Sequence, residues 1–171
     1  MQYGRITTLV GAVLALIGLG LQSASSDAEP ILPDLNAVNP DIPVGFDRVI
    51  TSMWDDSAAG TAIFLIALVA VIVVSLIPDI KDALSRMNAL IVTVLGVLMM
   101  VVGGIATSRA IDKADTLELG LAGAFEAGLI PQAFTVSTSV GWYLLAIGGV
   151  IAAIGGVLGL IARPDESALS D

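Results

Sequence analysis

The chain has 171 residues, of which 56% are hydrophobic and 13% are charged, and its mean hydropathy is +0.95. Soluble domains contain about 45–50% apolar and about 25% charged residues, so this composition indicates a membrane protein. Cysteine and histidine are absent, which excludes disulfides, histidine bases and the usual zinc and haem ligands. The net charge of −9 argues against nucleic acid as a partner. We therefore expect no cofactor and no metal.

Four apolar runs predict four transmembrane helices, because a helix needs ~20 apolar residues to cross the hydrocarbon core. The last three of these runs contain no charged residue. The predicted spans are 6–22, 58–77, 88–107 and 140–162. The fold class that follows is all-α and integral to the membrane, a four-transmembrane-helix bundle in which 1–171 form a single membrane domain.

The first run has a second interpretation. A basic flank before it and small residues after it are also typical of a secretory signal peptide ending near residue 25. Gly11, Ala15 and Gly18, however, recur at the i, i+4 and i+7 spacing of one helix face. A segment that is removed has no need of such a face, so we favour a retained helix.

The basic residues set the expected orientation. The short link 78–87 carries Lys81 and Arg86, whereas the loop 23–57 carries seven acidic residues and one basic residue. We therefore expect a multi-pass protein of the plasma membrane, with its N-terminus and its C-terminal tail 163–171 in the cytoplasm. Trp54, Trp142 and Tyr143 then lie at the outer interface, where aromatic rings are enriched.

The outer loops 23–57 and 108–139 are each expected to contain a short amphipathic helix. In the first, four prolines favour an extended start, and apolar residues at 46, 49, 50, 53 and 54 follow with helical spacing. In the second, Leu117, Leu121, Phe125 and Leu129 are spaced by four. We interpret the acidic residues of these loops as solvated, in preference to a calcium site or to a catalytic pair of Glu118 and Glu126.

Small residues predict how the helices pack. In the fourth helix, Gly148, Ala152, Gly155 and Gly159 occupy one face, and Gly11, Ala15 and Gly18 match them in the first helix. The third helix has Gly96 and Gly103. Close backbone contact is a main source of helix attraction in lipid, so the first and fourth helices should be neighbours. Packing within the chain and packing against another subunit both remain open. The one threonine well inside a span, Thr93, is expected to bond to its own helix.

The expected function is non-enzymatic, with no catalytic residues. No ionisable group lies inside a predicted span, and such groups mark proton pathways and substrate sites. The leading hypothesis is an accessory or scaffold subunit that packs through glycine-rich helix faces, in a homo-oligomer or a larger membrane protein complex in contact with membrane lipid. The alternative is a small oligomeric transporter or a lipid-handling membrane protein.

Overall fold

The computed structural model describes residues 3–27, 32–38, 40, 52–76, 84–130 and 132–161, and these are mostly helical. Four of the helices are long and apolar enough to cross a membrane. In chain order the elements are α1 Tyr3–Gly20, β1 Ala24–Ser26, α2 Leu32–Val38, α3 Met53–Asp56, α4 Ala58–Leu76, α5 Arg86–Glu126, β2 Val136–Thr138 and α6 Val140–Ile161.

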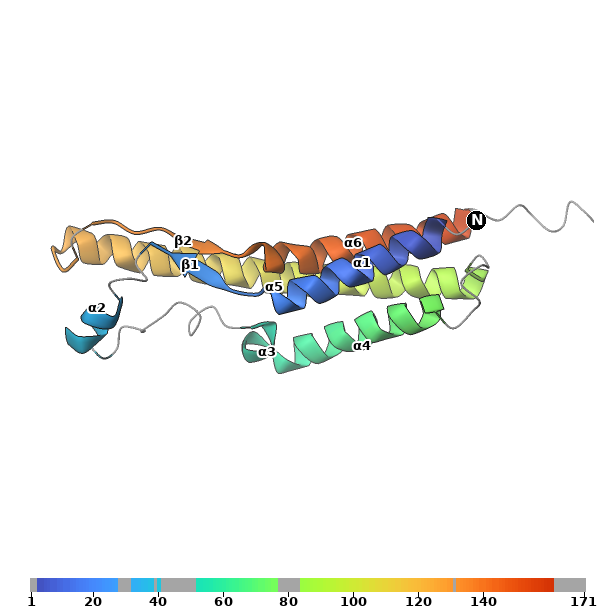
Figure 1. Cartoon of the computed structure of the whole chain (residues 1–171), viewed down its shortest axis with the longest axis horizontal. Helices are drawn as coiled ribbons and strands as arrows, with labels where there is room; N and C mark the ends of the chain where they lie inside the picture. Colours follow the sequence, from blue (N-terminus) through green and yellow to red (C-terminus); the bar gives the residue numbers. More distant parts are fainter. Residues whose placement is uncertain are drawn as a thin grey trace, which may run out of the picture.

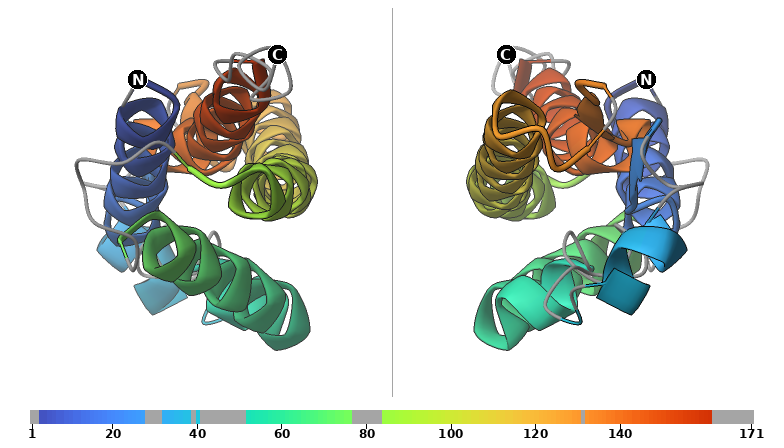
Figure 2. Two further views of the ribbon diagram at one scale, coloured as in Figure 1. Left: turned by 90° about the vertical axis from the view of Figure 1, so that its right-hand side faces the viewer. Right: turned by 90° about the vertical axis from the view of Figure 1, so that its left-hand side faces the viewer.

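The four long helices run side by side along the long axis of the molecule (Figure 1). α6 lies between α1 and α5 and packs along both, which makes these three helices the best-packed part of the chain (Figure 2). α4 runs across the same side of α1 and α5 with fewer contacts. The core between them is filled by Phe64, Leu68 and Val71 of α4 and by Met99 of α5, all buried.

The predicted span limits agree with the structure to within one or two residues for α4 and α6. α1 begins at Tyr3, so it includes Arg5, which the sequence placed before the helix. The Arg5 side chain is buried. The link 78–87 lies outside the described residues as far as position 83, and the tail 163–171 lies wholly outside them. Ser85 caps the start of α5, because its hydroxyl accepts a hydrogen bond from the Asn88 N–H at 3.1 Å.

The helix that contains the predicted span 88–107 extends well beyond it. α5 continues without a break to Glu126 and is 41 residues long, or about 61 Å at ~1.5 Å per residue. Residues 108–126 contain no proline and many good helix formers, so the helix extends beyond its apolar segment. The separate amphipathic helix expected in loop 108–139 is therefore the continuation of α5. Gly128, in the left-handed region at φ 71°, terminates it.

We call residues 109–126 of α5 the stalk, because Figure 1 shows this part extending beyond the ends of α1, α4 and α6. A short two-stranded ribbon runs beside it. β1 pairs antiparallel with β2, with Ala24 opposite Thr138 and Ser26 opposite Val136. The predicted all-α class therefore needs one correction, the presence of this ribbon. Its strands follow the end of α1 and precede the start of α6.

The loop 23–57 also differs from expectation. Pro33 was predicted to keep the chain extended, but it lies in the first turn of α2, where proline is tolerated because its missing N–H has no helical partner. Most of the predicted amphipathic helix at 46–54 lies outside the described residues. Its final part forms α3, and Ser57 then caps α4 by accepting a hydrogen bond from the Gly60 N–H at 3.1 Å.

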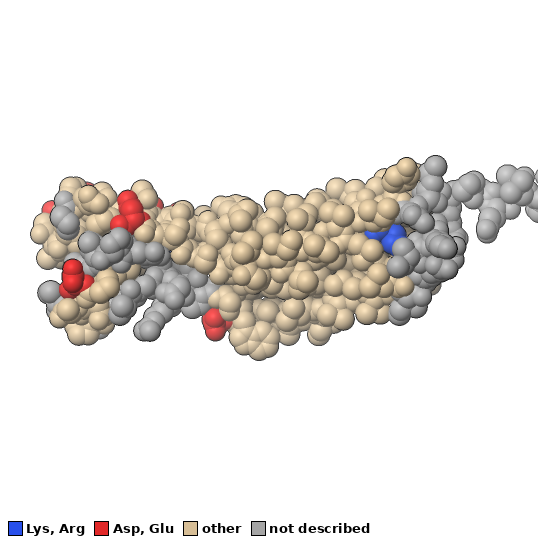
Figure 3. All heavy atoms as spheres, viewed as in Figure 1, with Lys and Arg blue, Asp and Glu red and all other residues tan. Residues whose placement is uncertain are grey.

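Among the residues that the structure describes, charge is confined to the two ends of the molecule. On the face in Figure 3, acidic side chains gather toward the stalk, a basic side chain lies near the opposite end, and the surface between them is uncharged. The sequence explains this belt, because residues 6–20, 58–76, 87–108 and 140–161 contain no charged residue. The start of α1 and the end of α6 lie together at the end opposite the stalk.

Candidate functional site

Small residues bring α6 directly against α1. A Cβ added to Gly11 would lie 2.5 Å from the backbone nitrogen of Ala152 and 2.6 Å from the carbonyl oxygen of Gly148. Gly155 faces Thr8 in the same way. Real side chains do not fit at such distances, so the two backbones approach as closely as they do only because these positions are small.

The other small residues predicted to pack α1 against α6 lie along this contact as well. A Cβ on Gly148 would be 2.7 Å from the backbone nitrogen of Ala15 and 2.8 Å from its Cβ. Near the stalk end, a Cβ on Gly18 would be 2.8 Å from the carbonyl oxygen of Gly141. At the opposite end, a Cβ on Gly4 would be 2.7 Å from the nitrogen of Gly159.

A second strip of small residues brings α6 against α5. A Cβ on Gly149 would overlap the backbone of Met100, and one on Gly96 would overlap that of Ala153. A Cβ on Gly103 would be similarly close to Leu145, at 2.9 Å from its carbonyl carbon. Both glycine strips of α6 are thus occupied within the chain.

Hydroxyl groups between the helices bond to helix backbones. Thr93 donates to the carbonyl of Ala89 at 2.8 Å, which confirms the prediction for this residue. Thr8 does the same with Gly4 at 2.9 Å. Thr107 donates to the Gly103 carbonyl of its own helix at 2.8 Å and to the Trp142 carbonyl of α6 at 2.6 Å. The last bond ties α5 to the first turn of α6.

The three aromatic residues expected at an interface have different surroundings. Trp54 is 53% exposed and Tyr143 is 44% exposed, whereas Trp142 is only 2% exposed. The indole N–H of Trp142 donates to the Ser23 carbonyl at 3.2 Å. Trp142 therefore packs at the junction between α1 and α6. An aromatic residue at a membrane interface is expected to have an exposed ring, and the ring of Trp142 is buried.

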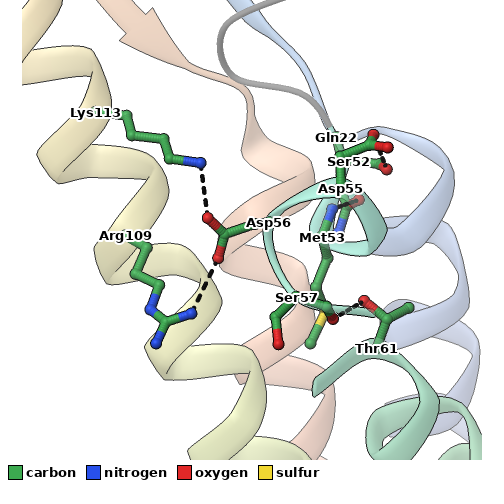
Figure 4. A network of polar contacts seen from close by, with 9 residues as sticks. All are labelled: Gln22, Ser52, Met53, Asp55, Asp56, Ser57, Thr61, Arg109 and Lys113. Carbon is green, nitrogen blue, oxygen red and sulfur yellow. Dashed lines mark hydrogen bonds and ion pairs between the residues drawn. The ribbon is translucent and has the colours of Figure 1, made fainter. Parts of the chain in front are cut away.

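The N-terminal end of α4 is joined to α5 by a network of ionic contacts (Figure 4). Asp56, which directly precedes the cap of α4, accepts from Lys113 Nζ at 2.7 Å and from Arg109 at 3.2 Å. The two basic residues are one helical turn apart on α5, so they bond to the two carboxylate oxygens of Asp56 from the same side. On the other side of α3, the Met53 N–H donates to Gln22 at 2.9 Å, which links α3 to the end of α1.

This network changes the acidity of Asp56. The hydrogen bond from Lys113, supported by Arg109, holds the pKa of Asp56 below its usual range, although partial burial acts in the opposite direction. The side chains of Arg109 and Lys113 are 55% and 41% exposed, so water screens both ion pairs. Asp56 is 53 positions before Arg109 and 57 before Lys113, so the spacing of these residues in the sequence does not indicate the pairing.

Acidic residues also attach the ribbon to the stalk. Glu118 accepts a hydrogen bond from the Val136 N–H of β2 at 2.9 Å. Asp27 accepts from the Thr135 N–H at 2.9 Å, and Ser26 donates to the Thr135 carbonyl at 2.5 Å. The Ser139 hydroxyl donates to the Leu21 carbonyl and accepts from the Ser23 N–H, which ties the end of α1 to the start of α6.

The acidic residues do not converge on one point. Within the described ranges, no group of three acidic side chains is placed so that it could hold a metal ion. Glu118 is engaged with the ribbon, and Glu126 lies two turns further along α5. The arrangement of carboxylates, amides and hydroxyls is that of a structural junction, which holds the stalk, the ribbon and the start of α4 together.

Comparison with known proteins assigns no family. The chain matches no protein-family model, no curated protein and no solved structure.

Proposed function

We propose that this chain is an integral membrane protein in which α1, α4, α6 and the first part of α5 span the bilayer. The uncharged belt supports this placement. From Arg86 to Arg109, α5 rises about 34 Å at ~1.5 Å per residue, close to the ~30 Å hydrocarbon thickness of a bilayer. Packing of α1 along α6 supports a retained first helix. Both termini are then cytoplasmic, and the stalk extends from the outer surface.

We further propose that the protein is a non-catalytic accessory or scaffold subunit. The observation that carries this proposal is the continuity of α5, which forms one rod from the inner end of the membrane segment to the tip of the stalk. The ribbon and the Asp56 contacts brace that rod near the outer surface. A helix supported in this way presents its tip at a constant height above the membrane, as a scaffold must.

The partner surface should lie outside the glycine strips, because these are already used within the chain. The stalk and the turn that follows it offer large apolar side chains that are exposed, namely Leu119, Phe125 and Leu129. Exposed apolar groups in one region are typical of interaction sites when they lie in water. We therefore place the contact with the partner subunit at the stalk.

Membrane placement is tested by labelling single cysteines, which is direct because the chain has no cysteine of its own. In sealed cells, a membrane-impermeant maleimide should label Asp115→Cys in the stalk. It should leave Arg86→Cys unlabelled until the membrane is opened, and Val94→Cys unlabelled in both cases. Labelling of Arg86→Cys in sealed cells would contradict the orientation.

The accessory role is tested by purifying the tagged full chain from its native membranes in mild detergent and measuring its native mass. We expect a stoichiometric partner that is lost in a Leu119→Glu/Leu129→Glu variant and kept in a control, Ile66→Val, on the exposed face of α4. A chain that purifies alone or only with copies of itself would overturn the accessory role and favour the transporter or lipid-handling alternative.

A further inference from the structure

One face of the stalk carries a hollow with the spacing of a helix-packing site. The hollow has a volume of about 320 Å³ and is lined by Asp115, Glu118, Leu119 and Ala122. These four residues stand at positions i, i+3, i+4 and i+7 of α5, so they share one side of the helix. One turn further, the same spacing is repeated by Leu119, Ala122, Gly123 and Glu126. We call these six residues the groove face.

The middle of the groove face is open. Gly123 is exposed, and a Cβ added to it would have no atom of the described residues within 4 Å. This differs from Gly11 and Gly149, where a Cβ would overlap the backbone of a neighbouring helix. Glycine weakens a helix, and no packing contact in the described part of the chain accounts for it here. The space beside Gly123 is therefore available to a second molecule.

In the proposed membrane placement, the groove face lies beyond the reach of lipid tails. Leu119 is ten residues past Arg109, the first charged residue after the uncharged segment 87–108, and thus about 15 Å further along the helix. Its side chain is nevertheless 74% exposed. Large apolar side chains that are exposed to water in one region are typical of protein contacts, so the groove face favours a protein partner over a lipid.

The spacing of the groove face favours a helix as the element that the partner presents. Where two helices pack closely, a side chain of one inserts into a hole formed by four residues of the other. The hollow at Leu119 is such a set of four, and the next set follows after one turn. A partner helix with large apolar side chains one turn apart can fill both.

The charge of the stalk decides which kind of helix fits. Four acidic residues stand against two basic ones in the stalk, and three of the four acidic residues belong to the groove face (Figure 3). Both basic residues, Arg109 and Lys113, are paired with Asp56. Lys113 is also two positions before Asp115, so the two side chains point to different sides of the helix. The groove face is therefore acidic around its apolar middle.

A second copy of the chain fits this surface poorly, because two groove faces would bring acidic residues against acidic residues. We propose that the groove face binds an amphipathic helix of the partner subunit, with large apolar side chains on one side and Lys or Arg beside them. The apolar side chains insert at Ala122 and Gly123, and the basic ones pair with Asp115 and Glu126. The inference rests on the proposed accessory role and specifies the chemistry of the partner.

The test uses the full chain in nanodiscs of phosphatidylcholine and two synthetic helical peptides. Both peptides have leucine at heptad positions a and d, and one has lysine at e and g where the other has glutamate. Binding is measured by fluorescence anisotropy of the labelled peptide. Empty nanodiscs are the blank, because amphipathic helices also bind lipid. We expect the lysine peptide to bind at least about tenfold more tightly, with a preference that shrinks at high salt.

The first pair of variants probes the charge. Asp115→Asn/Glu126→Gln should weaken binding of the lysine peptide about tenfold, while Glu118 is left in place because it holds the ribbon. The matched control Asp34→Asn/Asp55→Asn removes the same charge from α2 and α3. It should change the affinity by less than about twofold, since salt screens exposed charges that are not in contact.

The second pair of variants probes the shape. Gly123→Trp fills the middle of the groove face and should weaken binding of the lysine peptide about tenfold. Gly120→Trp is the matched control, because Gly120 lies outside the groove face and a Cβ there also has nothing within 4 Å. Unchanged thermal unfolding in each variant shows that the fold is kept.

Equal binding of the two peptides by the wild-type chain, or equal losses in the groove-face variants and their controls, would overturn the inference. A homodimer that dissociates in Leu119→Glu/Leu129→Glu would also overturn it, because the groove face would then bind a second copy. Failure of the accessory role is a separate outcome. A chain that co-purifies with a partner but does not discriminate between the peptides contradicts this inference alone, and one that discriminates but purifies alone contradicts only the accessory role.

Discussion

Gly149 of α6 lies so close to Met100 of α5 that a side chain on the glycine would overlap the methionine backbone. The two residues are far apart in sequence, and both lie in the middle of long apolar helices. Their contact shows that α6 is held on both flanks by backbone proximity, since Gly11 makes the equivalent approach from α1.

Gly149→Ala should destabilise the protein by about 1–3 kcal/mol, because the added methyl group forces α5 and α6 apart in a region without spare volume. The measurement is the thermal unfolding midpoint in detergent, followed by tryptophan fluorescence. Gly104→Ala is the matched control, since a Cβ there has nothing within 4 Å. Alanine is also the better helix former, so that variant should be as stable as the wild type or slightly more so. Equal midpoints for Gly149→Ala and the wild type would contradict the close packing.

The contact between Asp56 and Lys113 predicts a dependence on pH. Asp56→Asn should lower stability at neutral pH by about 0.2–1 kcal/mol, a range typical of ion pairs between exposed side chains. Because the pKa of Asp56 is lowered in the folded state, this stabilisation is fully present above the ordinary aspartate pKa of about 3.9. It disappears as the pH falls through the lowered value.

The difference in unfolding midpoint between wild type and Asp56→Asn should therefore be constant from pH 7 to about pH 5 and shrink below about pH 4. Lys113→Met provides the second arm of a double-mutant cycle, which isolates the pair from other effects of each change. A difference that grows as the pH falls would show that Asp56 is not held as a carboxylate by its basic neighbours.

Glu118 is predicted to hold the ribbon against the stalk. Glu118→Ala should speed hydrogen exchange of the Val136 amide about tenfold or more, because a hydrogen bond to a charged acceptor is lost. Glu118→Gln keeps an oxygen in the same place and should change the exchange rate much less. The measurement is hydrogen–deuterium exchange of the full chain, read for the peptide that covers β2. If both variants leave Val136 equally protected, the ribbon is held by other contacts.

The two tryptophans should differ in fluorescence. In Trp54→Phe, emission comes from the buried Trp142 and should be quenched little by aqueous acrylamide or by brominated lipid. In Trp142→Phe, emission comes from Trp54, which is 53% exposed, and at least one of the two quenchers should reach it. Strong quenching of Trp142 by brominated lipid would mean that its ring faces the bilayer, as an interface belt requires.

Hydropathy predicted α4 and α6 well, because in these helices the end of the apolar run coincides with a helix end. It did not indicate the end of α5, because the apolar run ends near Thr107 but the backbone continues as helix to Glu126. Helix propensity and hydropathy are separate properties, and residues 108–126 retain the first after losing the second.

The junction beside the stalk was harder to predict. β1 and β2 contain three residues each, with no alternation of apolar and polar side chains long enough to indicate a strand. Their pairing depends on how α1 and α6 lie against each other, which brings segments from opposite ends of the chain into contact. The partner of Asp56 was equally hard to predict, since only the packing of α4 on α5 brings it to Lys113.

Because α5 is one continuous helix, a change of tilt at one end moves the other end. If the membrane part of a rod about 61 Å long changes its tilt by about 10°, the far end moves by about 10 Å. Helices tilt more in a thin bilayer and less in a thick one, since they keep their apolar length within the hydrocarbon. In the proposed membrane placement, α5 would thus convert a local change in bilayer thickness into a displacement of the stalk tip, where Leu119 and Phe125 lie exposed.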